Sequence, residues 1–263
     1  MSTDASWVES MPEVYDRALG PALFAPFAAH LAGLMEPHAP RRLLELAAGT
    51  GIATAQLVKA LPACAITATD LNPAMVAWTS ERLAGPSWAQ ADAQLLQFAD
   101  GSFDAVVSQF GVMFFPDKPA AFAESARVLE PGGLMVFSVW DVVEGSPFPA
   151  AMVDSLNAVL ADPPTFIVRV PHGYADPVQI ADDLRAGGLE PESIDRVVLR
   201  GSSPSARTLT EGFCLGTPLR FALQECGPLD ELTEALAEEM TQRLGPGPVT
   251  GELAALVVTA RAS

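Results

Sequence analysis

The sequence predicts an α/β fold in which the strands of one sheet alternate with helices. The apolar run 43–46 ends in small residues and then becomes amphipathic, which is the pattern of a strand that turns sharply into a helix. A second apolar run, 65–69, ends at Asp70, 19 residues beyond Gly51. In a doubly wound sheet, a carboxylate at about that offset can accept hydrogen bonds from ribose hydroxyls. The two runs therefore predict a ligand-binding turn in an open sheet.

Residues that typically begin or end helices give the bounds of the other elements of this core. Pro62 ends the helix after the first strand, and Asn72-Pro73 supplies an N-cap and a proline at the first position of the next helix. Gly85-Pro86 ends that helix, and Asp117 with Pro119 starts another. The expected elements are a helix over about 53–61, a strand over 65–69, a helix from 73 to about 84, a strand over 87–90, a strand over 103–108, a helix to about 129 and a strand over 134–140.

The segments on either side of this core are less regular. An apolar, Ala-rich helix is expected over 19–35, and after residue 140 we expect helices over 148–160 and 177–187, strands over 194–200 and 252–261, and a mostly helical stretch over 202–248. The predicted division is an N-terminal helical cover (1–40), a ligand-binding core (41–140), a lid insertion (141–176), a further core segment (177–201), a second helical lid (202–250) and a final strand (251–263).

Composition excludes several classes of protein. With 263 residues and 49% hydrophobic content, the chain can bury a full core. Its formal net charge of −17 opposes binding to nucleic acid and to anionic membranes. We found no leader-like N-terminus and no long apolar run, which predicts a soluble, cytoplasmic protein. Three widely spaced Cys and three widely spaced His residues predict neither disulfides nor a metal site.

The turn after the first strand indicates which nucleotide binds. A dinucleotide fingerprint requires a third small residue at position 52, where this chain has Ile52. The segment E-L-A-A-G-T-G instead resembles motif I of the class I S-adenosylmethionine (SAM) dependent methyltransferases, with Ala47 in place of the first glycine. Asp70, Asp92 and the turn 131–133 follow in the order of that family. The chain looks like the small-molecule type found in ubiquinone and menaquinone biosynthesis (methyltransferase domain types 11 and 25).

This resemblance implies a Rossmann-like sheet of seven strands with helices on both faces and a helical lid. It also implies that SAM is the cofactor, that Asp92 accepts a hydrogen bond from the adenine amino group, and that an aromatic residue of the N-terminal cover closes over the cofactor. Asp92 as a simple turn cap is the alternative. The expected cofactor-binding residues are Tyr15, Glu45, Ala47, Ala48, Gly49, Gly51, Asp70, Leu71, Met75, Asp92, Ala93, Gln109 and Phe110.

The predicted activity is methyl transfer from SAM to a small, largely apolar acceptor under the lid. The apolar loop 110–115 and the aromatic residues of the two lid segments favour such an acceptor. Tyr15, Phe110 and Phe114 could face the sulfonium, or could serve only to pack the core. The alternatives are a nicotinamide-dependent oxidoreductase and a SAM-binding regulatory protein without turnover. The sequence does not distinguish oxygen, nitrogen, sulfur or carbon as the acceptor atom.

His172 is the candidate catalytic residue. It is the side chain in the lid whose ordinary pKa suits a general base near neutral pH, so it could deprotonate a hydroxyl or amine acceptor. Its setting between Pro171 and Gly173 also fits an exposed loop histidine without a catalytic role.

Overall fold

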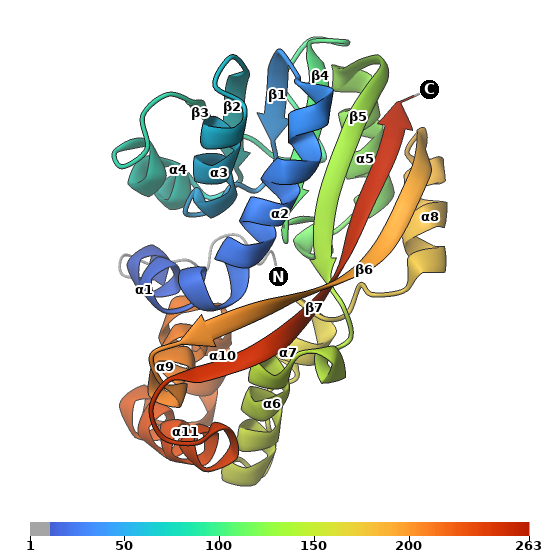
Figure 1. Cartoon of the computed structure of the whole chain (residues 1–263). Coiled ribbons are helices and arrows are strands. Elements are labelled where there is room, and N and C mark those ends of the chain that lie inside the picture. The colour runs from blue at the N-terminus through green and yellow to red at the C-terminus, as the bar shows by residue number, and fades with distance from the viewer. Residues whose placement is uncertain (1–10, 263) are drawn as a thin grey trace.

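The computed structural model describes residues 11–262, which form a seven-stranded sheet with helices on both faces (Figure 1). Residues 1–10 of the predicted cover, and Ser263, lie outside the described residues. In sheet order the strands are β3 (Ser87–Gln90), β2 (Ala65–Asp70), β1 (Arg42–Glu45), β4 (Phe103–Gln109), β5 (Leu129–Trp140), β7 (Val249–Ala262) and β6 (Leu189–Ser203). The first five are parallel, and β7 runs antiparallel to both of its neighbours. This confirms the predicted Rossmann-like sheet.

Alternate side chains of the central strands pack on opposite faces, because successive residues of a strand point to opposite sides. Leu43 of β1 joins the buried cluster of α2 (Ala25–Met35) and α3 (Ile52–Ala60). Leu44 points the other way, into the larger cluster that includes α5 (Lys118–Val128) and α8 (Pro177–Ala186). The core is therefore apolar on both faces, as a parallel sheet requires.

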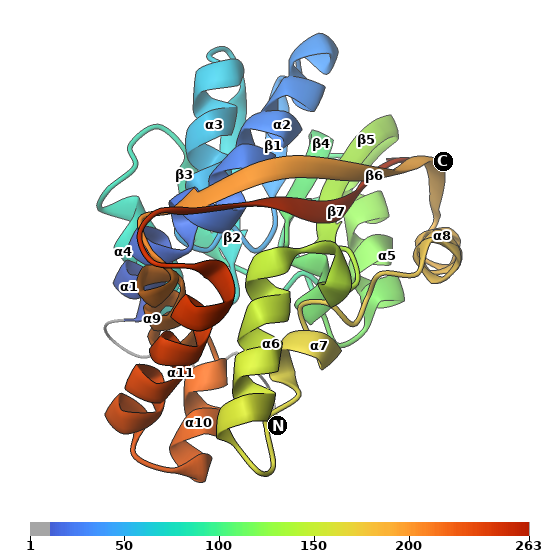
Figure 2. The same ribbon diagram turned by 60° about the horizontal axis from the view of Figure 1, so that its bottom comes forward.

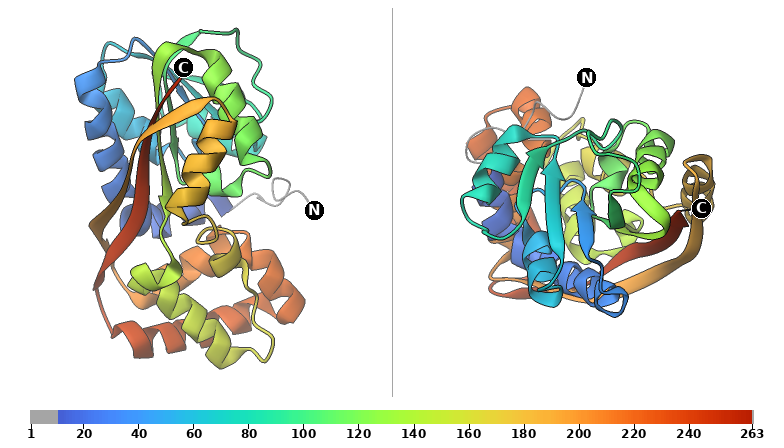
Figure 3. Two further views of the ribbon diagram at one scale, coloured as in Figure 1. Left: turned by 90° about the vertical axis from the view of Figure 1, so that its right-hand side faces the viewer. Right: turned by 90° about the horizontal axis from the view of Figure 1, so that it is seen from above.

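A helical lobe lies beyond the carboxyl ends of the parallel strands, below the sheet in Figure 1. Its helices are α6 (Pro147–Val159), α7 (Phe166–Arg169), α9 (Ala206–Gly216), α10 (Leu219–Cys226) and α11 (Leu229–Leu244). These helices lie within the two segments predicted as lids, 141–176 and 202–250. Figures 2 and 3 show the long β6–β7 hairpin running from the sheet to this lobe, so the hairpin belongs to both parts.

The predicted helix starts follow from side-chain caps. Asn72 Oδ1 accepts a hydrogen bond from the Ala74 amide at 2.8 Å and begins α4 (Pro73–Ser80). Asp117 Oδ1 accepts one from the Ala120 amide at 3.0 Å and begins α5. Both helices then have proline in their first turn, where no amide hydrogen is required.

Several boundaries differ from the sequence-based expectation. The expected helix 19–35 consists of a π-helix (Gly20–Phe24) followed by α2, and α1 (Met11–Ala18) precedes it at an angle of 47°. Pro21 lies in the π-helix and cannot donate a backbone hydrogen bond. Strands β6 and β7 extend beyond the expected 194–200 and 252–261, because antiparallel pairing continues from Leu189 and Ala262 to Ser203 and Val249.

Within residues 11–262, no single helix has the length and hydropathy of a membrane span. The bent pair Met11–Ala18 and Gly20–His38 reaches them only when the two helices are taken together.

Candidate functional site

A cavity of about 170 Å³, the first cavity, opens where β1, β2 and β4 end. Open α/β sheets bind their ligands at this edge. The structure brings together here all of the predicted cofactor-binding residues except Gly51: Tyr15, Glu45, Ala47, Ala48, Gly49, Asp70, Leu71, Met75, Asp92, Ala93, Gln109 and Phe110.

The Asp70 carboxylate ties the two turns at this edge together. Its Oδ2 accepts a hydrogen bond from the Gly49 amide, and its Oδ1 accepts one from the Asn72 amide, both at 2.9 Å. Gly49 belongs to the turn after β1, whereas Asn72 begins the turn after β2. One side chain thus fixes the separation of two loops.

Ala47 adopts the left-handed backbone conformation, with φ of 54°. An L-residue other than glycine pays about 1–2 kcal/mol for this conformation. Gly111 approaches this turn closely: a Cβ on Gly111 would lie 2.5 Å from Ala47 Cβ and 2.7 Å from Ser108 Oγ. Phe110 is also left-handed, with φ of 55°. Backbone strain is therefore concentrated in the wall of the first cavity.

Gly51 lies behind the turn rather than in the lining of the cavity. It has φ of 78° and begins α3 as its N-cap residue. A Cβ at this position would lie 2.5 Å from Thr79 Cγ2. Thr79 in turn donates a hydrogen bond from Oγ1 to the Gly49 carbonyl at 2.9 Å. Gly51 thus lets α4 pack against the turn and support it.

Glu45 carries a buried carboxyl at the end of β1. It is 1% exposed, and its Oε2 has no hydrogen-bond partner among the described residues. Burial raises the pKa of Glu45 to about 8, and the nearby negative charge of Asp70 adds to this effect. The carboxyl is therefore mostly protonated at pH 7 in the protein alone. A cationic or hydrogen-bond-donating group of a ligand could supply the partner that Glu45 Oε2 lacks.

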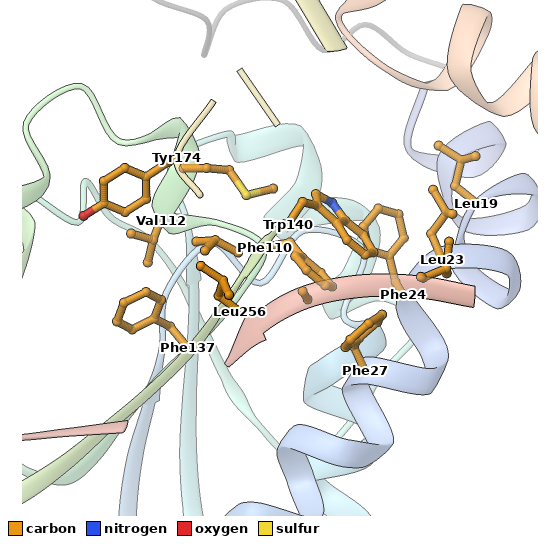
Figure 4. Packing of buried hydrophobic residues seen from close by; sticks show 14 of the residues in the cluster. Leu19, Leu23, Phe24, Phe27, Phe110, Val112, Phe137, Trp140, Tyr174 and Leu256 are labelled. Carbon is orange, nitrogen blue, oxygen red and sulfur yellow. The ribbon is translucent and has the colours of Figure 1, made fainter. Parts of the chain in front are cut away.

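An aromatic wall bounds the first cavity on the side of the helical lobe. Tyr15 stacks on Phe24 with ring centroids 4.8 Å apart, and Phe110 stacks on Trp140 at 3.7 Å. Figure 4 shows Phe24 beside the Phe110 and Trp140 rings. Gln109 anchors the N-terminal cover to β4, because its Nε2 donates to the Phe24 carbonyl at 2.9 Å. Burial raises the pKa of Tyr15, so this phenol stays neutral.

A second cavity of about 100 Å³ lies behind this wall. The two cavities share Tyr15, Phe24, Phe110, Phe114, Phe166 and Pro218. Within residues 11–262, no Lys, Arg, Asp or Glu lines the second cavity, and its titratable lining groups are Tyr15 and His172. Its other lining residues are Leu19, Leu23, Met113, Trp140, Ser146, Pro149, Ile167, Pro171, Phe213, Thr217 and Leu253.

His172 is buried in the wall of the second cavity, so the alternative of an exposed loop histidine is wrong. It is 8% exposed, and its Nδ1 lies 2.6 Å from the Asp141 carbonyl oxygen. The turn packs tightly because Gly173 approaches the Arg169 backbone; a Cβ on Gly173 would lie 2.1 Å from the Arg169 carbonyl oxygen. Burial lowers the pKa of His172, which keeps the imidazole neutral at neutral pH.

Sequence reasoning missed Phe24 and Trp140. Trp140 is the last residue of β5, and ligands lie outside strand ends, so its position could have identified it. Phe24 is the last residue of the π-helix, and the apolar pattern of the sequence does not reveal this change of helix type.

We predict that Ala47→Gly raises the free energy of unfolding by about 1 kcal/mol, because glycine adopts the left-handed conformation without strain. The matched control is Ala39→Gly, an exposed left-handed alanine (φ of 43°) distant from the cavity in the fold. Urea unfolding of both variants measures the effect. Destabilisation by Ala47→Gly alongside stabilisation by Ala39→Gly would contradict the strain at position 47.

Comparison with known proteins agrees with this geometry. Residues 44–137 match the family model described as "Methyltransferase domain". The chain is 38% identical over 102 residues to the demethylmenaquinone methyltransferase of Thermus thermophilus, which covers 37% of the chain and 46% of that relative. It is 28% identical over 266 residues, 94% of both chains, to the nocamycin O-methyltransferase of Saccharothrix syringae. The chain spans less than half the length of the first of these relatives.

Among solved structures, the YcgJ protein of Bacillus subtilis superposes with a TM-score of 0.57 at 21% identity, covering 89% of this chain and 98% of that one. This likeness concerns the fold. Residues 44–137 are thus similar to a methyltransferase domain, and the fold of the chain agrees with that similarity.

Proposed function

We propose that this protein transfers a methyl group from SAM to a small, uncharged, largely apolar acceptor. The observation that carries the proposal is the pair of adjoining cavities with opposite character. The first is lined by the carboxyl groups of Glu45, Asp70 and Asp92, whereas the second is almost entirely apolar. They share an aromatic wall, which is where a donor and an acceptor would meet.

The residues of the first cavity fit SAM. Glu45, with its orphaned Oε2, would receive the ammonium of the amino-acid part. Asp70 would accept hydrogen bonds from the ribose hydroxyls. Asp92 uses Oδ1 to accept from the Gln94 amide at 2.9 Å, which leaves Oδ2 for the adenine amino group. When bound, SAM supplies an electrophilic methyl group on a sulfonium.

The protein's main contribution is to orient the two partners. Holding reactants in line can supply about 7–11 kcal/mol of the barrier, so no covalent intermediate on the protein is required. The rings of Tyr15, Phe110 and Phe114 would favour a sulfonium by about 0.5–2 kcal/mol each where their faces meet it. The same rings exclude water from the shared wall.

The lining of the second cavity selects an acceptor without formal charge. A carboxylate, phosphate or ammonium bound there would lose its hydration and find no counterion among the described lining residues. An apolar acceptor gains from burial against Trp140, Phe213 and Leu253 instead.

The relatives' names support this class of acceptor. One relative is named for demethylmenaquinone, and the relative similar over 94% of both chains is an O-methyltransferase. An oxygen acceptor is therefore the first to test.

His172 would act as the general base for a protic acceptor. Its imidazole is neutral at neutral pH and lines the second cavity. The acceptor's X–H bond would leave its electron pair on the acceptor atom and its proton on the imidazole.

The division of the chain follows the same proposal. Residues 1–40, 141–176 and 202–250 would cover the acceptor, whereas 41–140, 177–201 and 251–263 would form the core that holds SAM. A cytoplasmic location stays a prediction, and so does the absence of nucleic-acid and membrane partners, which the net charge of −17 supports.

The experiment that tests this function has two steps. Calorimetry with SAM and with NAD separates a methyltransferase from a nicotinamide-dependent oxidoreductase, and we expect heat with SAM alone. A screen of uncharged phenols, alcohols, amines and quinols by a mass shift of one methylene then separates turnover from regulatory binding. Tight binding of NAD, or methylation confined to charged acceptors, would contradict the proposal.

We predict that Asp70→Asn weakens SAM binding about 10- to 100-fold, because hydrogen bonds to a charged group contribute about 1.5–3 kcal/mol. Asp104→Asn is the matched control: the Asp104 carboxylate also accepts from two backbone amides, those of Arg41 and Arg42, both at 2.9 Å, but it does not line the cavity. Calorimetry and thermal unfolding should show loss of affinity in the first variant alone. Equal affinities in both variants would remove Asp70 from the site.

We also predict that SAM binding at pH 7 releases a proton from Glu45. The pKa of Glu45 is about 8 in the folded chain against an ordinary 4.5, so its contribution to folding is complete below pH 4.5 and is lost as the pH rises through 8. A bound ammonium favours the carboxylate and lowers that pKa. Calorimetry in two buffers of different ionisation enthalpy measures the release, and Glu45→Gln should abolish it. Proton release unaffected by Glu45→Gln would assign it to another group.

A further inference from the structure

The imidazole of His172 is held by a backbone carbonyl that is itself unusually well fixed. Asp141 follows directly after β5, and its carbonyl oxygen lies 2.6 Å from His172 Nδ1. A carbonyl oxygen only accepts hydrogen bonds, so Nδ1 carries the hydrogen. In the neutral ring, Nε2 then has the lone pair, and it has no hydrogen-bond partner among residues 11–262.

Three further contacts fix Asp141. Its amide donates to the Ala254 carbonyl at 3.1 Å, which anchors it to β7. Its side-chain Oδ1 accepts from the Val142 amide at 2.8 Å. Its Oδ2 accepts from Arg196 Nε at 2.6 Å. The carbonyl that holds His172 is thus attached to β5, β6 and β7 at once.

Arg196 brings the β6–β7 hairpin into this arrangement. It pairs with Leu256 in the hairpin register, 55 residues along the chain from Asp141. Gly145 closes over the ion pair: a Cβ on Gly145 would lie 3.3 Å from both Arg196 Nη2 and Asp141 Oδ2. The Arg196 side chain is 53% exposed, and such pairs contribute little to stability. The Arg196–Asp141 ion pair is therefore better suited to holding Asp141 in position than to stabilising the fold.

We propose that Asp141 and Arg196 are positioning residues, which fix the Asp141 carbonyl and thereby hold His172 in the tautomer whose Nε2 can accept a proton in the second cavity. This inference deepens the proposed function and rests on it for the identity of the base. The tautomer itself does not depend on any ligand.

The charged groups around His172 agree with this role. Burial lowers its pKa, and the nearby acidic groups, Asp141 and Glu144, oppose that effect. Arg196 offsets the negative charge of Asp141, because its Nε lies 2.6 Å from Asp141 Oδ2. A neutral imidazole with a fixed orientation is what a general base for a weakly acidic X–H group requires.

The test compares Arg196→Met with Arg200→Met. Arg200 lies on the same strand, donates to Thr250 Oγ1 at 3.2 Å and makes no described contact with His172, so it controls for general damage to the hairpin. Nitrogen-15 NMR of labelled histidines at pH 7.5, assigned with His172→Gln, reports the tautomer without SAM or acceptor. Thermal unfolding confirms that both variants fold.

We expect Nδ1–H for His172 in the wild-type protein and in Arg200→Met, and a mixture of tautomers in Arg196→Met and Asp141→Asn. With an acceptor in hand, kcat of Arg196→Met should fall at least 10-fold, with KM for SAM unchanged and full activity in Arg200→Met. An Nε2–H tautomer in the wild-type protein, or identical spectra for both arginine variants, would overturn the positioning role. If the NMR spectra are as expected but the screen finds no acceptor that is methylated, the proposed function is contradicted and the positioning role is not.

Discussion

The convergence of two backbone amides on the Asp70 carboxylate is the constraint on which the first cavity depends. Parallel strands bring the ends of β1 and β2 together, but they do not set the separation of the loops that follow. Asp70 sets it, because the Gly49 and Asn72 amides each lie 2.9 Å from one of its oxygens. The side chain that we propose to recognise a ribose thus also builds the turn that carries Ala47 and Ala48. Recognition and local structure cannot be separated at this position.

The strained backbone at Ala47 and Phe110 accompanies the close approach of the two loops at Gly111. Left-handed backbone at both residues lets the β1 turn and the loop after β4 approach at Gly111. Phe110 is thereby directed onto Trp140, and the two rings form part of the wall between the cavities. Left-handed backbone at these two positions costs folding free energy, and both residues lie in the wall of the first cavity.

The sequence predicted the sheet and the first cavity because their determinants are local. Small residues at 47–51, Asp70 after an apolar run and the Asn72-Pro73 cap each encode their own conformation. The bend between α1 and the helix that begins at Gly20, the full length of the β6–β7 hairpin and the burial of His172 were not predicted, because each arises from contacts between distant segments. The Asp141–Arg196 pair joins the residue directly after β5 to a residue of β6, and neither residue belongs to a motif.

Carboxyl groups line the first cavity, whereas no Lys, Arg, Asp or Glu lines the described second cavity. The first cavity gathers Glu45, Asp70 and Asp92 and, within the described residues, no Lys or Arg. Such a lining favours a ligand with positive charge. Methyl transfer converts a charged sulfonium into a neutral thioether, so we expect this lining to hold the donor more firmly than the spent product. Lys, Arg, Asp and Glu are absent from the described lining of the second cavity, so under the proposed function release of the methylated acceptor would depend on its apolar contacts there.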